Sequence, residues 1–289
     1  MKKGIFYIIL AGVLWGTSGI FVNILSLYGF DALMTTALRG LIASLVMGIY
    51  IFAANKKLFK ANKKELLYFI SNGMAMVGTS AFYFASIRAA SVSTAVILMY
   101  TAPVFVMIYS VSFLGEKLNL KKGISVVLML IGCALVSGIV GGMKFSTWGI
   151  TAGLLAGISY STYNILTKIE MKKGYNAVSA TLYSFISMTV VSFIISKPLQ
   201  IFTLTSEHPL VLIPLIIALG IVTCVLPYLF YTLALKELPV GTASSLAIVE
   251  PLAATFFSFA VLGESLSIYS VAGGILILSS VYILSKFSN

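Results

Sequence analysis

Apolar runs of about twenty residues follow one another along the whole chain, and only short polar stretches separate them. An α-helix of about 20 residues crosses a hydrocarbon core of about 30 Å, so each run is long enough to span a bilayer. The composition agrees, because 60% of the 289 residues are hydrophobic and only 9% are charged. A soluble domain carries about a quarter of its residues as charged side chains. The sequence therefore predicts an all-α integral membrane protein.

Polar breaks divide the chain into ten apolar segments. They cover about residues 4–26, 30–54, 65–86, 92–114, 121–140, 147–167, 176–196, 209–235, 241–262 and 267–286. Lys2 and Lys3 before the first segment also resemble the start of a signal peptide. The apolar character continues past Gly16 through Val22, so we expect a retained first helix.

Most basic residues lie in every second connection between these segments, and these connections are on the same side of the membrane. If the N-terminus lies inside, the outer loops contain only Arg88, Lys144 and Lys197. Cytoplasmic loops are rich in lysine and arginine, so we expect both termini in the cytoplasm and the protein in the cytoplasmic membrane. Because the basic residues stand in short clusters between apolar runs, the net charge of +11 does not indicate nucleic-acid binding. The residues assigned to the inner side are Lys2, Lys3, Lys56, Lys57, Lys60, Lys63, Lys64, Lys117, Lys121, Lys122, Lys168, Lys172, Lys173, Lys236 and Lys286.

The second half of the chain resembles the first at a constant offset. The matching landmarks are Leu114-Gly115-Glu116 with Leu262-Gly263-Glu264, Pro103 with Pro251, and Tyr83 with Tyr231. Each half holds five segments, an odd number, so the second half enters the membrane from the opposite side. Inverted repeats are a transporter architecture, because exchanging the conformations of the halves exposes a central site to each side in turn. We place the two units at residues 1–145 and 146–289.

The order and spacing of these landmarks resemble the EamA-type transporters of the drug/metabolite transporter superfamily. The residues that carry the resemblance are Trp15-Gly16, Ala37-Leu38-Arg39, Tyr83 with Ala85, Pro103, Leu114-Gly115-Glu116, Glu250-Pro251 and Leu262-Gly263-Glu264. The resemblance covers nearly the whole chain. It implies ten helices, cytoplasmic termini and a central cavity between the halves. Members of this family move small organic solutes, often amino acids or related metabolites, and many are exporters.

Glu250 lies near the middle of its segment, about nine residues or roughly 14 Å from the inner end. Placing a carboxyl group at this depth in the membrane costs free energy, so we expect the residue to have a functional or structural role. Pro251 leaves a backbone carbonyl one turn earlier without its helical partner, and transporters place binding sites at such breaks. Glu250 is either a proton carrier or partner for a cationic substrate group, or a structural residue in an ion pair or hydrogen bond. The equivalent residue before Pro103 is Ala102, so we expect a single carboxylate.

Arg39 reaches a similar depth from the outer side. Two interpretations stay open. Arg39 forms a buried ion pair with Glu250 that breaks during transport, or its side chain extends outward to Asp31 or to lipid headgroups.

Several polar and aromatic residues at middle depth are predicted to line the cavity. They are Trp15, Thr79, Ser80, Tyr100, Tyr160 and Thr223. Such walls suit a small amphipathic solute, although aromatic residues also simply pack between helices. The residues considered for gating are Tyr83, Tyr231, Pro103 and Pro251, and an interfacial belt is the alternative for the two tyrosines.

Small residues every fourth position indicate close helix packing. Gly12 and Gly16 stand in the first segment, and Gly149, Gly153 and Gly157 stand in the sixth. We expect packing surfaces, with dimerisation as the alternative, so the protein is a monomer or a homodimer. Glu116 and Glu264 are expected as helix caps or local ion-pair partners.

The remaining function classes find little support. The chain contains no Gly-x-x-x-x-Gly-Lys-Ser/Thr loop, so ATP is not its driver. Cys133 and Cys224 lie in apolar runs, and we expect no metal and no cofactor. The sequence predicts a secondary transporter, an exporter of amino acids or related amines, with protons as a candidate coupling ion. The alternatives are an uncoupled facilitator and an intramembrane lipid-modifying enzyme, for which one glutamate and one arginine make a poor catalytic set.

Overall fold

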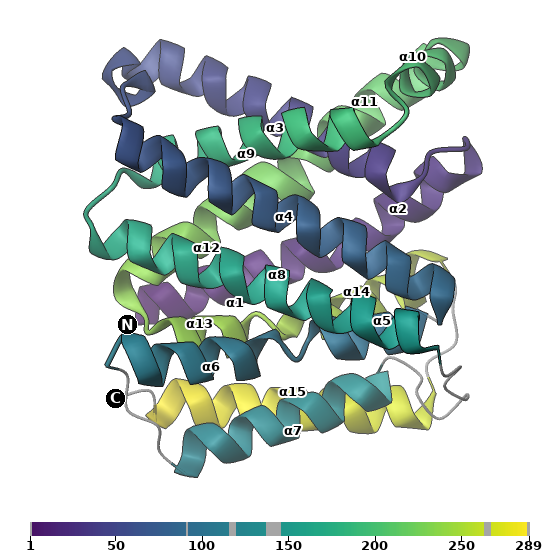
Figure 1. Ribbon diagram of the computed structural model, residues 1–289. Coiled ribbons are helices and arrows are strands. Elements are labelled where there is room, and N and C mark those ends of the chain that lie inside the picture. The colour runs from purple at the N-terminus through teal and green to yellow at the C-terminus, as the bar shows by residue number, and fades with distance from the viewer. Residues whose placement is uncertain (1, 91, 116–119, 137–145, 263–266, 288–289) are drawn as a thin grey trace.

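The computed structural model describes residues 2–90, 92–115, 120–136, 146–262 and 267–287, and the regular structure in these residues is helical (Figure 1). The helices of the first half are α1 (Lys2–Gly16), α2 (Ser18–Leu27), α3 (Ala32–Ala54), the short 3₁₀ helix η1 (Lys56–Phe59), α4 (Lys63–Ala89), α5 (Val92–Met99), α6 (Ala102–Phe113) and α7 (Leu120–Val136). Those of the second half are α8 (Thr147–Lys172), α9 (Ala177–Ile195), α10 (Pro198–Glu207), α11 (Pro209–Gly220), the π-helical turn η3 (Ile221–Val225), α12 (Leu226–Glu237), α13 (Val240–Leu246), α14 (Val249–Leu262) and α15 (Ile268–Phe287).

The helices run side by side, and both ends of the chain lie at the same end of the bundle (Figure 1). We call this end the N face; it carries Lys2, η1 and the α8–α9 turn at Gly174. We call the other end the distal face; it carries the α2–α3 turn at Gly29 and the end of α4 at Ala89.

Six helical segments in the described residues are long and apolar enough to cross a membrane by length and composition. They are Lys2–Leu27, Ala32–Ala54, Thr94–Phe113, Ala177–Ile195, Pro209–Glu237 and Val240–Val261. Helices α4, α7, α8 and α15 run alongside them and complete the ten expected crossings (Figure 1). The prediction of an all-helical membrane protein is confirmed.

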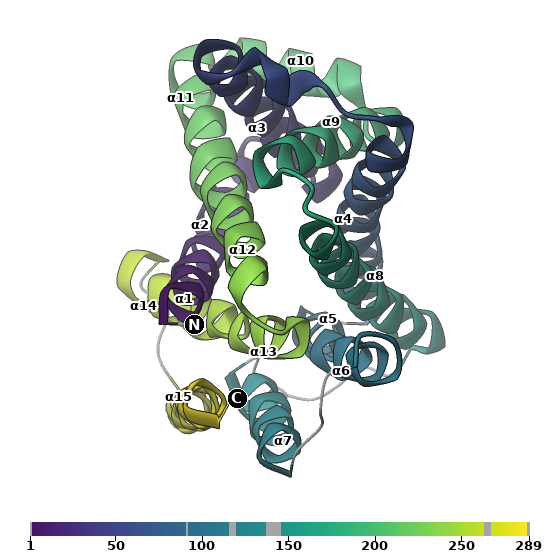
Figure 2. The same cartoon turned by 90° about the vertical axis from the view of Figure 1, so that its left-hand side faces the viewer.

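Equivalent helices of the two halves run in opposite directions. Helix α1 leaves the N face, whereas α8 runs toward it (Figure 1). Helix α1 packs against α12, α13 and α14 of the other half, and α8 packs against α4, α5 and α6, which form the equivalent segments of the first half. The end-on view shows a ring of helices with the α7–α15 pair outside it (Figure 2). This pairing is what two inverted repeats produce.

The glycine patterns lie where the halves meet. A Cβ atom added to Gly16 of α1 would lie 2.6 Å from the Cβ atom of Ala253 on α14. One added to Gly157 of α8 would lie 2.8 Å from the carbonyl oxygen of Leu98 on α5. Only glycine allows these backbones to come so close, so the repeated glycines belong to the α1–α14 and α8–α5 contacts.

Two prolines accompany breaks at equivalent places in the two halves. Helix α13 ends at Leu246 and α14 begins at Val249, just before Pro251. The Ala247 carbonyl, four residues before this proline, accepts a tightened hydrogen bond of 3.0 Å from the Glu250 backbone N–H. Near Pro103, α5 ends at Met99 and α6 begins at Ala102. A proline cannot supply the N–H that would continue the preceding helix.

Two loop assignments are corrected by the structure. The stretch expected as a polar loop before the eighth segment contains α10, whose first residue is Pro198, a residue well suited to a helix start. Lys168, expected in an inner loop, is only 8% exposed on α8. Its ammonium group donates to the carbonyls of Leu235, at 2.7 Å, and Leu238 at the end of α12, so it acts as a cap there. Glu116, Lys117, Lys144 and Glu264 lie outside the described residues.

Candidate functional site

A cavity of about 430 Å³ lies between the two halves. Its walls come from α1, α2, α3, α4 and α5 of the first half and from α8, α11, α12 and α14 of the second. It extends from Glu250 toward the distal face, where Val22, Ala32 and Ile87 line it. Both repeats therefore contribute to one central site, as expected for this architecture.

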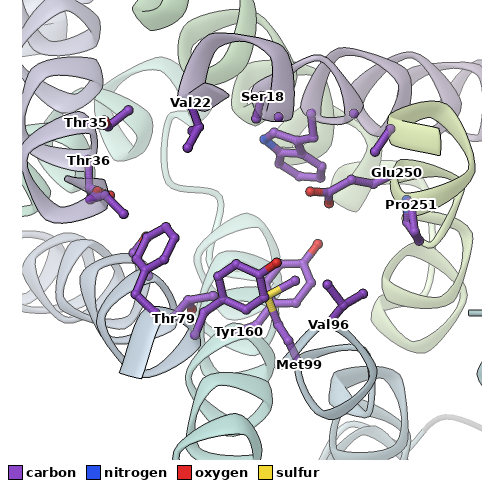
Figure 3. Close-up of a pocket in the computed structure, with 18 of the residues that line it drawn as sticks. Ser18, Val22, Thr35, Thr36, Thr79, Val96, Met99, Tyr160, Glu250 and Pro251 are labelled. Atoms are coloured by element: carbon purple, nitrogen blue, oxygen red, sulfur yellow. The ribbon is translucent and has the colours of Figure 1, made fainter. Parts of the chain in front are cut away.

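Glu250 points into this cavity from the first turn of α14, with Pro251 beside it and Tyr160 across from it (Figure 3). The hydroxyl group of Tyr100 donates a hydrogen bond to the Glu250 carboxyl group. The break before α14 places this carboxyl at the start of a helix, where the helix dipole favours a negative charge. The broken helix thus explains how an acidic side chain is tolerated at this depth.

Arg39 lies on the same cavity wall, on α3. One of its terminal nitrogens, Nη2, donates to the Ser80 hydroxyl at 3.3 Å, while its Nε atom is buried and has no partner. In the part of the chain that the structure describes, no ion pair joins Arg39 to Glu250 or to Asp31. The cavity therefore presents a carboxylate and a guanidinium that are not paired with each other.

Aromatic rings close the cavity on the side of the N face. The Trp15 ring lies edge-on to Tyr228 with centroids 5.1 Å apart, and the Tyr163 ring lies 5.4 Å from Tyr228 and 5.8 Å from Tyr231. Trp15, Tyr163 and Tyr228 line the cavity, and Tyr231 is fully buried behind them. Edge-to-face and offset contacts of this kind stabilise a packed barrier. We call Trp15, Tyr163, Tyr228 and Tyr231 the aromatic floor.

Most of the residues predicted for the site line the cavity. They are Trp15, Arg39, Thr79, Ser80, Tyr83, Tyr100, Tyr160, Glu250 and Pro251. Three others do not. Thr223 is buried in η3, and its hydroxyl donates to the Leu219 carbonyl at 2.7 Å; Tyr231 lies behind Trp15; and Pro103 is buried at the start of α6.

Further polar and aromatic residues of the cavity wall were not predicted from the sequence. They are Ser18, Thr35, Thr36, Tyr163, Tyr228 and Thr255. Helical spacing could have indicated some of them, because residues three or four apart share a face. Tyr163 follows Tyr160 by three positions, and Thr35 and Thr36 precede Arg39 by four and three.

A family model described as the EamA-like transporter family matches residues 2–138 and again residues 147–286. The chain belongs to the EamA-like transporter family. It is therefore a membrane transporter and not an enzyme, so the alternative of a lipid-modifying enzyme is excluded.

Two curated transporters are similar to this chain over nearly their whole length. A protein of Archaeoglobus fulgidus, named as an uncharacterized transporter, is 29% identical over 283 residues, which cover 98% of this chain and 96% of that protein. An uncharacterized inner membrane transporter of Salmonella typhimurium, YicL, is 25% identical over 295 residues, with 98% and 95% covered. A solved crystal structure superimposes with a TM-score of 0.81 at 16% identity, covering 100% of this chain and 98% of the other, and it shows that the fold is shared.

Proposed function

We propose that this transporter exports small amines, and above all zwitterionic amino acids and their relatives, across the cytoplasmic membrane by alternating access. The observation that carries this proposal is the presence of Glu250 and Arg39, unpaired with each other, on the wall of one cavity between the two repeats. An ammonium group suits Glu250 and a carboxylate group suits Arg39, since buried charges need partners.

The rest of the cavity supports a solute of this size and polarity. Its volume of about 430 Å³ falls in the range of small-molecule sites, roughly 300–1,000 Å³. Trp15 Nε1 and Arg39 Nε are buried donors without a partner, and a bound solute with oxygen acceptors would satisfy them. The rings of Tyr100 and Tyr160 offer apolar surface for the carbon skeleton.

Alternating access follows from the arrangement of the halves. The aromatic floor lies between the cavity and the N face, and the cavity extends toward the distal face, so we assign this conformation as the one that is open to the distal side. Exchanging the conformations of the two repeats would open the other side. In this proposal a proton on Glu250 supplies the coupling, and the rival is a facilitator that moves the same solute without an ion.

Substrate charge provides the test of the proposed function. In proteoliposomes containing only this protein, we expect flux of an amino acid found by a thermal-shift screen, because ligand binding raises the melting temperature. Its N-acetyl and carboxamide derivatives, which lose one charge each, should be transported at least about tenfold more slowly, the loss that corresponds to about 1.4 kcal/mol. Equal flux of all three compounds would contradict the assignment of Glu250 and Arg39.

The proposed orientation places both termini and the N face in the cytoplasm, with the two units divided near residue 145. Lys57 on the N face and Glu207 on α10 are exposed. We expect a membrane-impermeant thiol reagent added to intact cells to label Glu207→Cys and to label Lys57→Cys only after the membrane is opened. The native Cys133 and Cys224 are buried and should contribute little background. Labelling of both positions from the same side would show that the orientation is wrong.

A further inference from the structure

A second, smaller polar pocket lies below the aromatic floor, on the side of the N face. Its polar wall consists of Asn72 of α4, Thr167 and Glu170 of α8, Thr181 and Ser184 of α9, and Thr232 of α12. The empty volume of this pocket is about 10 Å³, which is close to the volume that one water molecule or an ion of similar size requires. Met76, Tyr163 and Tyr228 line both this pocket and the central cavity, so the two sites are neighbours.

The serine and threonine hydroxyl groups of this pocket use their protons on the backbone, whereas the buried hydroxyl group of Tyr163, which also lines the pocket, has no partner among the described residues. Each serine or threonine donates to the carbonyl four residues earlier in its own helix: Thr167 to Tyr163 at 2.8 Å, Thr181 to Ala177 at 2.8 Å, Ser184 to Ala180 at 2.8 Å and Thr232 to Tyr228 at 2.7 Å. A hydroxyl group has one proton and two lone pairs, so these serine and threonine side chains offer only acceptors to the pocket.

Glu170 adds a carboxyl group to these neutral oxygens and is 0% exposed. The amide nitrogen of Asn72 donates to the Thr167 hydroxyl at 2.9 Å and to both carboxyl oxygens of Glu170 at 3.3 Å. The amide oxygen of Asn72 is buried and has no partner. Among the described residues, no lysine or arginine forms an ion pair with Glu170. Burying a carboxylate, or an acceptor atom that receives no hydrogen bond, costs free energy unless a positive group pairs with it.

We propose that this pocket binds one monovalent metal cation. Glu170 supplies the negative charge, and the Asn72 amide oxygen and the hydroxyl groups supply neutral oxygen ligands. Carboxylate, amide and hydroxyl oxygens are hard ligands that suit hard cations. One positive charge cancels the single carboxylate, whereas a divalent ion would leave a net positive charge buried.

A proton on Glu170 is the weaker alternative. It would give the pocket one additional donor and would leave most of the acceptors unsatisfied, and it would not use the space of about 10 Å³. A metal cation contacts several oxygens at once. In the described residues no group of three His, Cys, Asp or Glu side chains could hold a metal ion, so a site of this kind depends on neutral oxygens around one carboxylate.

The position of the site indicates what the cation would do. Its ligands come from α4 of the first half and from α8, α9 and α12 of the second. A cation bound here holds these four helices together below the aromatic floor, and it therefore favours the conformation that is closed to the N face. The inference goes beyond the proposed function, since it holds whether or not Glu250 carries a proton.

Thermal unfolding of the purified protein in detergent tests the site without any transport assay. The salts are NaCl, KCl and choline chloride at equal concentration. We expect NaCl or KCl to raise the melting temperature above that in choline chloride by about 2–4 °C, because a ligand of the folded state stabilises it. Glu170→Gln should abolish the difference. The control Glu207→Gln, which removes an exposed carboxyl group on α10, should retain it.

Thr232→Val provides a second variant that keeps the carboxyl group and the shape of the side chain. It removes one oxygen ligand, so we expect the NaCl or KCl concentration for half-maximal stabilisation to rise about tenfold, the effect of about 1.4 kcal/mol. The proposal is overturned if the wild-type protein melts at the same temperature in all three salts. It is also overturned if the metal-salt effect survives unchanged in Glu170→Gln. Neither result bears on solute flux, so failure of this site and failure of the proposed transport are distinguishable.

Discussion

Replacing Glu250 with glutamine is expected to abolish proton-driven flux and its dependence on pH. Glutamine keeps the shape of the side chain and can still accept the hydrogen bond from Tyr100, but it cannot bind and release a proton. It also cannot attract an ammonium group, so we expect the remaining downhill flux to fall about tenfold or more, the effect of losing one hydrogen bond to a charged group. Flux in proteoliposomes with and without an imposed pH gradient measures both effects.

Glu207→Gln is the matched control for this experiment, since Glu207 is exposed on α10 and far from the cavity wall. Its transport should equal that of the wild type. Arg39→Ala and the double variant extend the test. If both side chains hold the same zwitterion, the losses should be less than additive, because the second substitution acts on a solute that is already poorly held. Unchanged gradient-driven flux and unchanged pH dependence in Glu250→Gln would rule out coupling through this residue.

Among alanine replacements of the described glycines, Gly73→Ala is expected to cause the largest loss of stability. The added Cβ atom would lie 2.3 Å from the Ser184 carbonyl oxygen, 2.6 Å from the Ser187 Cβ atom and 2.9 Å from the Met188 backbone nitrogen. Two of these atoms belong to the backbone of α9, so no side-chain rotation relieves the clash and α4 must move away. Overpacking of this kind costs about 1–3 kcal/mol. The melting temperature in detergent should fall by several degrees.

Gly48→Ala is the control for this prediction, because it makes the same change inside helix α3 where nothing lies within 4 Å of the added Cβ atom. Alanine is favoured over glycine inside a helix by about 0.5–1 kcal/mol, so its melting temperature should be unchanged or higher. Similar shifts for the two variants would mean that the α4–α9 contact is looser than the structure shows.

Some features of the site followed from the sequence because depth in the membrane depends only on position along a helix. A rise of about 1.5 Å per residue was enough to place Glu250, Arg39 and Trp15 at similar depths, and all three line the cavity. Thr223 has a suitable depth as well, but it lies in the π-helical turn η3 and its hydroxyl bonds within its own helix. Depth alone could not show which way its side chain faces.

Other features depended on contacts between distant parts of the chain. Lys168 stands close to Lys172 and Lys173 in the sequence and is therefore assigned to an inner loop, and nothing in the sequence singles out Glu170. Only the packing of α8 against α4 and α12 shows that Lys168 caps α12 and that Glu170 is sealed beside Asn72. In the same way, equal depth is consistent with an Arg39–Glu250 ion pair, whereas the structure joins the Arg39 guanidinium to Ser80 and shows no such ion pair among the described residues.

The sequence by itself determined that this is a helical membrane protein, that its two halves repeat in opposite directions, and which side chains lie deep in the bilayer. These properties follow from apolar length, from the odd number of crossings in each half and from the constant rise of a helix. The tertiary structure alone decided which deep side chains face the cavity, which pair with one another and which remain without a partner. Those properties depend on how each helix is rotated and where it lies in the bundle, and packing between residues far apart in the chain sets both.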